Sequence, residues 1–310
     1  MTDRRDMLLG YIYAALGAAL FSTKAIFIKL AYQEVANAPL MLGLRMAFSL
    51  PFFLLAGIVI FTTQRKQALS LPSRRAWLGA IGSGFFGYYL SSLLDLEGLT
   101  YITAQLERLV LFTYPVLVML LGAWFFGGKL TKQGLIAGAI SYLGLAVVLR
   151  EGLSGGGQNV WLGTSLVFGC AITFALYQLL AKKYISLMGA SLFTCVALSS
   201  SAVTSLIHYG VVTGGMDLSA SPRFLWLAFC TAIFATVLPS FLINWGMARI
   251  GPQSTSMVSG ASPILTIWLA VELLGEPFTL IDALGAALII GSVSWYGLMD
   301  VQVKTRMAAD

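Results

Sequence analysis

Long apolar runs separated by short polar segments dominate the chain. The runs are about 20 residues long, enough for a helix to cross a hydrocarbon core of roughly 30 Å. The pattern predicts ten transmembrane helices, at about 7–30, 38–62, 76–97, 101–126, 133–149, 160–181, 188–212, 224–247, 253–274 and 279–299. We therefore predict an all-α membrane protein. The connecting segments are too short to hold a soluble domain.

Part of the chain repeats itself at a fixed offset. Residues 86–139 align without a gap with residues 234–287, 148 positions later. Identical pairs include Phe86/Phe234, Ser92/Ser240, Gly98/Gly246, Pro115/Pro263 and Gly127/Gly275. The match continues more weakly from the first helix to the sixth at an offset of 153, with Gly10/Gly163 and Phe21/Phe174. The sequence thus predicts two repeats of five helices, at 7–149 and 160–299.

The two repeats are expected to cross the membrane in opposite directions, because five is an odd number of crossings. Inverted repeats of this kind are typical of secondary transporters, and a pseudo-two-fold axis in the membrane plane relates their halves. The substrate site then lies near the midplane, between the repeats.

Composition and charge agree with a membrane location. Only 10% of residues are charged and 58% are hydrophobic, whereas a soluble domain has about 25% charged residues. If the N-terminus is inside, the inner segments hold 13 basic residues and the outer segments hold two, Arg150 and Arg223. Basic residues collect in cytoplasmic loops, so both termini are predicted to be cytoplasmic, in the inner (plasma) membrane. The net charge of +6 then reflects topology, not a nucleic-acid partner.

Three sequence blocks carry a resemblance to a known family. They are Leu44–Arg45, TYPVLVMLLGAWFFGGKLT at 113–131 and ASPILTIWLAVELLGEPFT at 261–279. The chain resembles the drug/metabolite transporter superfamily, in its ten-helix branch of two EamA-type repeats, and is most similar there to bacterial aromatic amino acid exporters. The resemblance implies export of small metabolites. The first repeat departs from the pattern, with Gly128–Lys129 where the second has Glu276–Pro277.

Ionisable residues inside the predicted helices are concentrated in the first half. A charged side chain at the bilayer centre costs about 2.5–3.5 kcal/mol on insertion scales, so each is a functional candidate. The first half has Lys24, Arg45, Asp95, Glu97, Glu107 and Arg108; the second has Glu272 and Asp282.

Two interpretations of these charges remain open. In the first, they form ion pairs that hold the outer helix ends together, and the side chains of Arg45, Glu97 and Arg108 reach water. Alternatively, Lys24, Arg45 and Asp95 act in gating and Glu107 contacts substrate. Lys24 needs either an aqueous cavity or a carboxylate, which Asp95 or Glu107 would supply.

Polar residues at helical spacing predict a cavity between the repeats. Thr255, Ser259, Ser262 and Thr266 share one helix face, as do Thr236, Ser240 and Asn244. The predicted substrate-binding residues are Tyr88, Glu107, Tyr114, Tyr177, Asn244 and Ser259. The alternative is ordinary packing of membrane helices through small and hydroxyl side chains.

Pro115 and Pro263 occupy matched positions within predicted helices and are hinge candidates, a static kink being the alternative. The cysteines Cys170, Cys195 and Cys230 have no metal-ligand spacing and are expected to be buried thiols. The single histidine, His208, cannot form a metal site alone. We expect no metal and no cofactor.

The sequence therefore predicts a secondary transporter that exports small metabolites, most notably aromatic and other neutral amino acids, by alternating access. The alternative is an exporter or flippase of another metabolite or lipid-linked carrier. An intramembrane enzyme is disfavoured because the protease motifs are missing. No phosphate-binding Walker A motif is present, so proton coupling and facilitated efflux both remain open. The expected partners are a small-molecule substrate and the bilayer, with the chain a monomer or weak oligomer.

Overall fold

The computed structural model describes residues 4–66, 72–128, 130–154, 159–258 and 262–307, and these residues form helices joined by short loops. The first half contains α1 (Arg4–Ser22), α2 (Lys24–Tyr32), α3 (Ala38–Lys66), α4 (Arg74–Gly84), the π-helix η1 (Phe85–Leu90), α5 (Ser91–Tyr101), α6 (Ala104–Leu111), α7 (Tyr114–Phe125) and α8 (Lys132–Ser154). The second half contains α9 (Val160–Met188), α10 (Ala190–Thr213), α11 (Pro222–Ala232), the π-helix η2 (Ile233–Val237), α12 (Leu238–Val258), α13 (Ser262–Leu274) and α14 (Leu280–Met307).

The predicted all-α membrane class is confirmed. Among the described residues, eight helical runs are long and apolar enough to cross a membrane, and Ser262–Leu274 is a shorter apolar helix. The number ten stays a prediction. Several helices are longer than their apolar runs; α9, for example, continues to Met188 although the sequence pattern predicts an end near residue 181.

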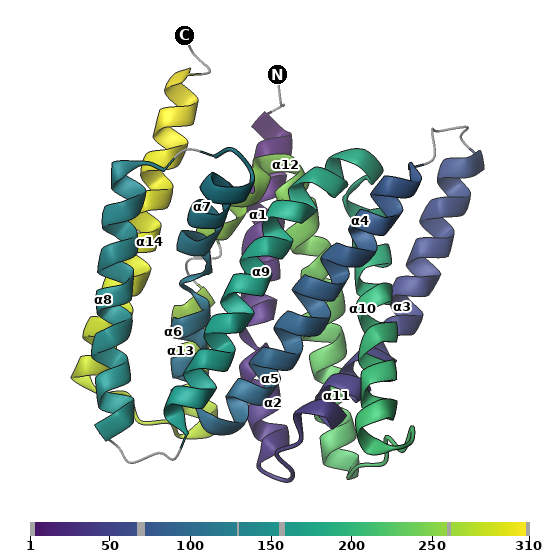
Figure 1. Ribbon diagram of the computed structural model, residues 1–310, viewed down its shortest axis with the longest axis horizontal. Coiled ribbons are helices and arrows are strands. Elements are labelled where there is room, and N and C mark those ends of the chain that lie inside the picture. The colour runs from purple at the N-terminus through teal and green to yellow at the C-terminus, as the bar shows by residue number, and fades with distance from the viewer. Residues whose placement is uncertain (1–3, 67–71, 129, 155–158, 259–261, 308–310) are drawn as a thin grey trace.

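The two halves run in opposite directions through the bundle. Figure 1 shows both termini at one end of the molecule, which we call the terminal end. The run from α4 to α5 leads away from that end, whereas the equivalent run from α11 to α12 leads toward it (Figure 1). The opposite end is called the distal end below.

Most of the packing joins one half to the other. Helix α1 packs along α12, and α5 packs along α9. Glycines make these approaches close: a Cβ added to Gly98 would lie 3.0 Å from the carbonyl oxygen of Gly163, and one added to Gly246 would lie 3.0 Å from that of Gly10. These two contacts are equivalents under the repeat. The two repeats therefore interlock, and neither has a core independent of the other.

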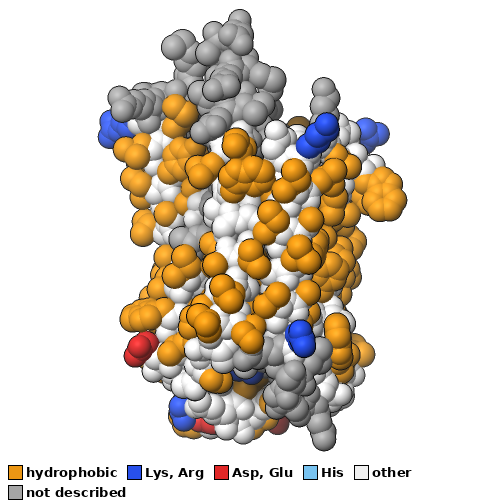
Figure 2. All heavy atoms as spheres, turned by 90° about the vertical axis from the view of Figure 1, so that its left-hand side faces the viewer, with side chains coloured by type: hydrophobic (Ala, Val, Ile, Leu, Met, Phe, Trp, Pro, Cys, Tyr) orange, Lys and Arg blue, Asp and Glu red, His pale blue; other side chains and the backbone are white. Residues whose placement is uncertain are grey.

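The lateral surface of the bundle is apolar. Figure 2 shows hydrophobic side chains covering the middle of the face formed by α8 and α14, with charged side chains near the two ends. Exposed residues there include Leu135, Ile136, Leu143, Leu284 and Leu288. Such a belt is stable only against lipid tails, in agreement with the predicted bilayer location.

Two glycine-ended helices preserve the repeat in atomic detail. Gly127 and Gly275 follow α7 and α13 with φ of 68° and 66°, a left-handed conformation that glycine adopts at low cost. The next amide in each repeat, Gly128 or Glu276, donates to the carbonyl six residues earlier, Gly122 or Ala270, at 2.9 and 3.2 Å. This is the Schellman motif that ends many helices.

Several predicted single helices are in fact interrupted. The first breaks at Thr23, between α1 and α2, and the fourth breaks at Phe112–Thr113, between α6 and α7. The π-helices η1 and η2 interrupt the third and eighth, beginning 148 residues apart. Hydropathy detects apolar runs but not such breaks, because the apolar run continues beyond each of them.

The expectation that Pro115 lies in a helix interior is wrong, because it is the second residue of α7. Pro263 is the second described residue of α13, and its place relative to the start of that helix stays a prediction. Proline is compatible with the first turn because the amide it lacks would have no intrahelical acceptor there. The residues 259–261 before α13 lie outside the described part of the chain.

Candidate functional site

The break in the first helix leaves backbone carbonyls that other helices satisfy. The Arg108 guanidinium donates to the Phe21 carbonyl at 3.3 Å, and the Thr266 hydroxyl donates to the Ser22 carbonyl at 3.0 Å. The Ser22 hydroxyl meets that of Ser262 at 3.0 Å. Irregular backbone at membrane depth is tolerated where protein groups satisfy it in this way. The broken helix is thus joined to both α6 and α13.

Lys24 is the first residue of α2 and lies against two carboxylates. Its Nζ is 2.7 Å from Asp95 Oδ2 and 3.9 Å from Glu107 Oε1, and all three side chains are buried. Arg108 Nε is 3.8 Å from Glu107 Oε2. The expectation that Asp95 or Glu107 neutralises Lys24 is confirmed. Together with Arg45, these residues form a group that we call the charge cluster: Lys24, Arg45, Asp95, Glu107 and Arg108.

Arg45, from α3, differs from the rest of the charge cluster. Its side chain is 2% exposed, and its Nε and one terminal nitrogen have no hydrogen-bond partner within the described ranges. Arg108 is 3% exposed. The interpretation in which Arg45 and Arg108 reach water at the outer surface is therefore wrong, because both are enclosed by protein.

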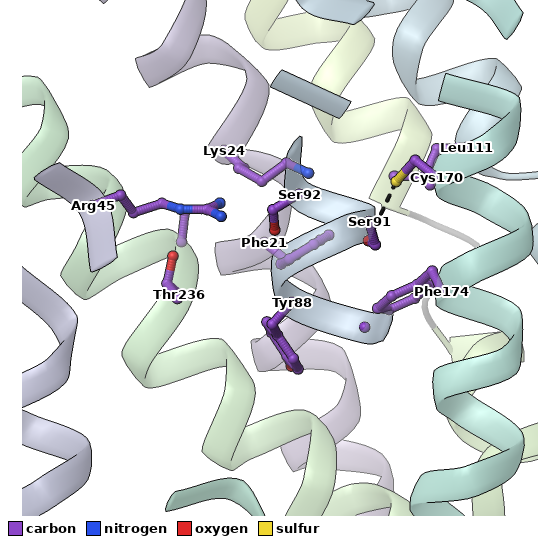
Figure 3. A pocket seen from close by; sticks show the side chains of 12 residues that line it. Phe21, Lys24, Arg45, Tyr88, Ser91, Ser92, Leu111, Cys170, Phe174 and Thr236 are labelled. Carbon is purple, nitrogen blue, oxygen red and sulfur yellow. Dashed lines mark hydrogen bonds between the residues drawn. The ribbon is translucent and has the colours of Figure 1, made fainter. Parts of the chain in front are cut away.

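Arg45 and Lys24 line a small pocket near the two π-helices. Its volume is about 20 Å³, and its other polar walls are Tyr88, Ser91, Ser92 and Thr236. Figure 3 shows the Arg45 side chain reaching from α3 toward Ser92, with Thr236 close to its guanidinium. The Cys170 thiol and the Ser91 hydroxyl are 3.4 Å apart on the opposite wall (Figure 3).

Aromatic rings surround the pocket. Phe21 stacks on its repeat equivalent Phe174 with centroids 6.5 Å apart, and the Lys24 ammonium lies 4.9 Å from the Phe21 centroid. Phe174 also contacts Tyr114 and Tyr177, at 5.3 and 5.8 Å. Since Phe21 and Phe174 come from the two repeats, their contact lies where the halves meet.

Where the first half has charges, the second half has a neutral network. Tyr177, the repeat equivalent of Lys24, donates to Asn244 Oδ1 at 3.3 Å. Asn244 in turn donates from Nδ2 to the Thr194 hydroxyl at 2.7 Å. Tyr88 meets Tyr177 edge to face at 5.1 Å, so the neutral network reaches the small pocket.

A much larger cavity, of about 770 Å³, lies at the terminal end. We call it the terminal cavity. Its walls are the ends of α7, α9, α12 and α14 and the loops beside them, with Lys182, Lys183, Gly128 and Gly251 among its residues. Leu111, the last residue of α6, lines the small pocket, while Pro115 of α7 lines the terminal cavity. Tyr114 lies between the two.

The distal end is closed by a contact between the repeats. The Glu276 carboxylate accepts from the Ala104 and Gln105 amides at 2.8 and 3.1 Å, capping the N-terminus of α6. Anions are stabilised at helix N-termini, where amides have no intrahelical acceptor. We call this contact the distal latch. Sequence reasoning noted Glu276 only as a motif residue and missed this role, although the unequal pair Gly128/Glu276 was a signal.

The repeat equivalent of the distal latch is missing at the terminal end. The position matching Glu276 is Gly128, which has no side chain, and the position matching Thr103 is Gly251. Both glycines line the terminal cavity. The contact thus lies at the end that has the carboxylate, and the terminal cavity lies at the end that lacks it.

The comparisons with known proteins agree with this geometry. Residues 8–150 and 161–298 each match the EamA-like transporter family. The chain belongs to this family. Each match covers one of the two halves described above, so the EamA-like family accounts for nearly the whole length.

Proteins similar to this chain are named as transporters. The uncharacterized transporter YcbK of Bacillus subtilis is 28% identical over 285 residues, covering 91% of this chain and 90% of that protein. The uncharacterized transporter sll1319 of Synechocystis is 22% identical, covering 96% of each. A solved crystal structure is similar with a TM-score of 0.64 at 18% identity, covering 96% of this chain and 98% of that one. That likeness shows the fold.

The structure brings most predicted site residues together. Tyr88, Tyr177, Asn244 and Tyr114 are buried around the small pocket, and Lys24, Arg45, Asp95 and Glu107 form most of the charge cluster. Ser259 lies outside the described residues. Phe21, Phe174 and Ser92 line the pocket although the sequence did not single them out as binding residues.

The Lys24–Asp95 pair provides a stability prediction. Asp95→Asn leaves a buried ammonium short of a counter-charge, so we expect a loss of about 3–5 kcal/mol. The double variant Lys24→Met/Asp95→Leu removes both charges and should recover most of that stability. Unfolding of the purified protein in detergent measures both.

The control is the half-exposed pair Asp6–Arg249, whose atoms are 3.7 Å apart. Asp6→Asn should change stability by less than about 1 kcal/mol, as is usual for surface pairs. Equal losses in Asp6→Asn and Asp95→Asn would show that burial does not determine the strength of the Lys24 pair.

Proposed function

We propose that this chain is a secondary transporter that exports small metabolites, chiefly amino acids, from the cytoplasm by alternating access. The observation that supports this most directly is the asymmetry between the ends. A cavity of about 770 Å³ lies at the terminal end, while the distal latch joins the two repeats at the other end.

The distribution of basic residues supports an inward-facing orientation of this state. Arg65, Lys66, Arg74 and Arg75 lie at the helix ends beside the termini, whereas Arg223 lies at the distal end (Figure 1). By the positive-inside rule the terminal end is cytoplasmic. The terminal cavity would then admit substrate from the cytoplasm, and release would require the distal latch to open.

The cavity size fits a small metabolite. Ligand pockets typically measure about 300–1,000 Å³, and the terminal cavity is within that range. Its walls are mixed, with Met119, Leu179 and Tyr296 beside Lys182 and Ser186. Such walls suit a molecule with an apolar side chain and a polar end, which describes a neutral amino acid.

Thiol labelling tests the orientation. Ser186 lines the terminal cavity, Ser219 is exposed at the distal end, and the three native cysteines are buried. We expect a membrane-impermeant maleimide to label Ser219→Cys but not Ser186→Cys in intact cells, and the reverse in inside-out vesicles. The opposite pattern would place the termini outside.

Substrate exchange tests the activity. Proteoliposomes containing the pure protein should exchange labelled neutral amino acids, and Glu107→Gln should slow exchange at least tenfold because Glu107 contacts both Lys24 and Arg108. Asp282→Asn is the matched control, since Asp282 only caps α14 through Thr279, at 2.9 Å. We expect near-normal exchange from that variant.

Two results would contradict these expectations. Equal exchange by Glu107→Gln and Asp282→Asn would argue against a role for Glu107 in transport. No exchange of any amino acid by the wild type would remove amino acids as the substrate.

A further inference from the structure

The geometry points to Arg45 as the residue that binds the substrate's carboxylate. This inference rests on the proposed transport function, and it adds to it a substrate class: small metabolites with one carboxylate group. Four observations support it, namely the missing partner of Arg45, the charge balance, the pocket walls and the route from the terminal cavity.

Among the described residues the buried guanidinium of Arg45 forms no ion pair, although the Asp95 carboxylate acts on it from beyond ion-pair distance. The other members of the charge cluster form ion pairs with one another, at 2.7–3.9 Å, whereas no ion pair of Arg45 occurs among the described residues. Its Nε and a terminal nitrogen also lack hydrogen bonds there. A buried charge normally has a partner because its desolvation is costly. A buried guanidinium without an ion pair, lying beside a pocket, is therefore explained if a bound ligand is its partner.

The net charge of the charge cluster also supports a ligand carboxylate at Arg45. The charge cluster contains three cationic side chains, Lys24, Arg45 and Arg108, and two carboxylates, Asp95 and Glu107. With every group ionised, one positive charge is left over. A single carboxylate group neutralises it when the ammonium group of the ligand lies outside the charge cluster, whereas a dianionic phosphate would leave a negative excess in a low-dielectric site.

The pocket walls also suit a carboxylate. A guanidinium offers parallel N–H donors that match the two oxygens of a carboxylate. The side chains of Ser92, Thr236 and Tyr88 line the same space (Figure 3). The volume of about 20 Å³ admits about one water-sized group, so only the head of a substrate fits in this conformation.

The rest of the substrate has space on the terminal side. Leu111 and Phe174 line the small pocket. Pro115 and Leu179, about one helical turn farther along the chain from each of them, line the terminal cavity. Tyr114 lies between the two and touches Phe174. A rotation of these rings would join the two spaces, with the carboxylate at Arg45 and the side chain in the terminal cavity.

Thermal unfolding with matched ligands tests the assignment. The probes are L-phenylalanine, L-leucine and L-threonine, each compared with its amide, which keeps the ammonium and side chain but has no carboxylate. We expect the acids, and not the amides, to raise the unfolding temperature of the wild type. In Arg45→Gln the acids should bind at least about tenfold more weakly, since a hydrogen bond to a charged group contributes strongly.

The unliganded variant provides a second readout. Because Arg45→Gln removes an unpaired buried charge, its unfolding temperature without ligand should equal or exceed that of the wild type. A purely structural arginine predicts the opposite. Arg65→Gln, which removes an exposed charge at the far end of the same helix α3, is the control and should keep the full response to acids.

The outcomes separate the two claims. Equal stabilisation by acids and amides, no stabilisation by any acid, or an unchanged response in Arg45→Gln would each overturn the role of Arg45. A lower unfolding temperature of unliganded Arg45→Gln, or its failure to fold, would contradict the second readout and show a structural role for Arg45. The wild-type comparison and Arg45→Lys, which keeps the charge but loses the paired donors, then decide whether Arg45 also binds the carboxylate. Failure of amino-acid exchange in liposomes combined with acid-specific stabilisation would contradict the proposed substrate, while the carboxylate site would stand.

Discussion

Burial of charge inside a membrane protein is the constraint on which this structure depends. Five ionisable side chains are enclosed in one region where lipid offers no partner, and four of them form ion pairs with one another. Lys24 is held by Asp95 and Glu107, and Arg108 satisfies a carbonyl of the broken first helix. The breaks, the π-helices and the buried polar side chains all lie around this region. The regular, apolar helix surfaces face outward.

The second organising feature is a repeat whose symmetry is kept in the scaffold and broken in the site. Equivalent glycine contacts join α1 to α12 and α5 to α9, and both Schellman motifs are preserved. At the site, Lys24 corresponds to Tyr177, and Asp95 corresponds to Ile243. A symmetric scaffold permits two equivalent end states. In the proposed transport cycle, unequal residues decide which state is more stable, and we propose that the pair Gly128/Glu276 favours the one open at the terminal end.

Much of the fold was predictable because apolar runs and the offset of 148 residues are properties of sequence alone. The partners of Lys24 were also predictable, since a buried ammonium requires a carboxylate and few were available. The helix breaks at Thr23 and Phe112 were not, because a few polar residues such as Ser22, Thr23 and Lys24 do not end an otherwise apolar run of helical length. The burial of Arg45 was missed for a related reason: its position early in a helix gives no information about the neighbouring helices that enclose it.

The distal latch also escaped prediction, because a carboxylate that follows a helix-ending glycine resembles an ordinary loop residue. Its partner, the N-terminus of α6, lies about 170 residues away in the sequence and only the inverted packing brings it near. We propose that this one unequal pair, Gly128 and Glu276, holds the distal end closed and leaves the terminal end open.

Distances between spin labels test that claim most directly. One pair, at Val35 and Phe278, spans the distal end; the other, at Phe126 and Ser186, spans the mouth of the terminal cavity. We expect Glu276→Gln to lengthen the distal distance and to shorten the terminal one, compared with the control Glu272→Gln on the exposed face of α13. Unchanged distances at both ends in Glu276→Gln would contradict that claim.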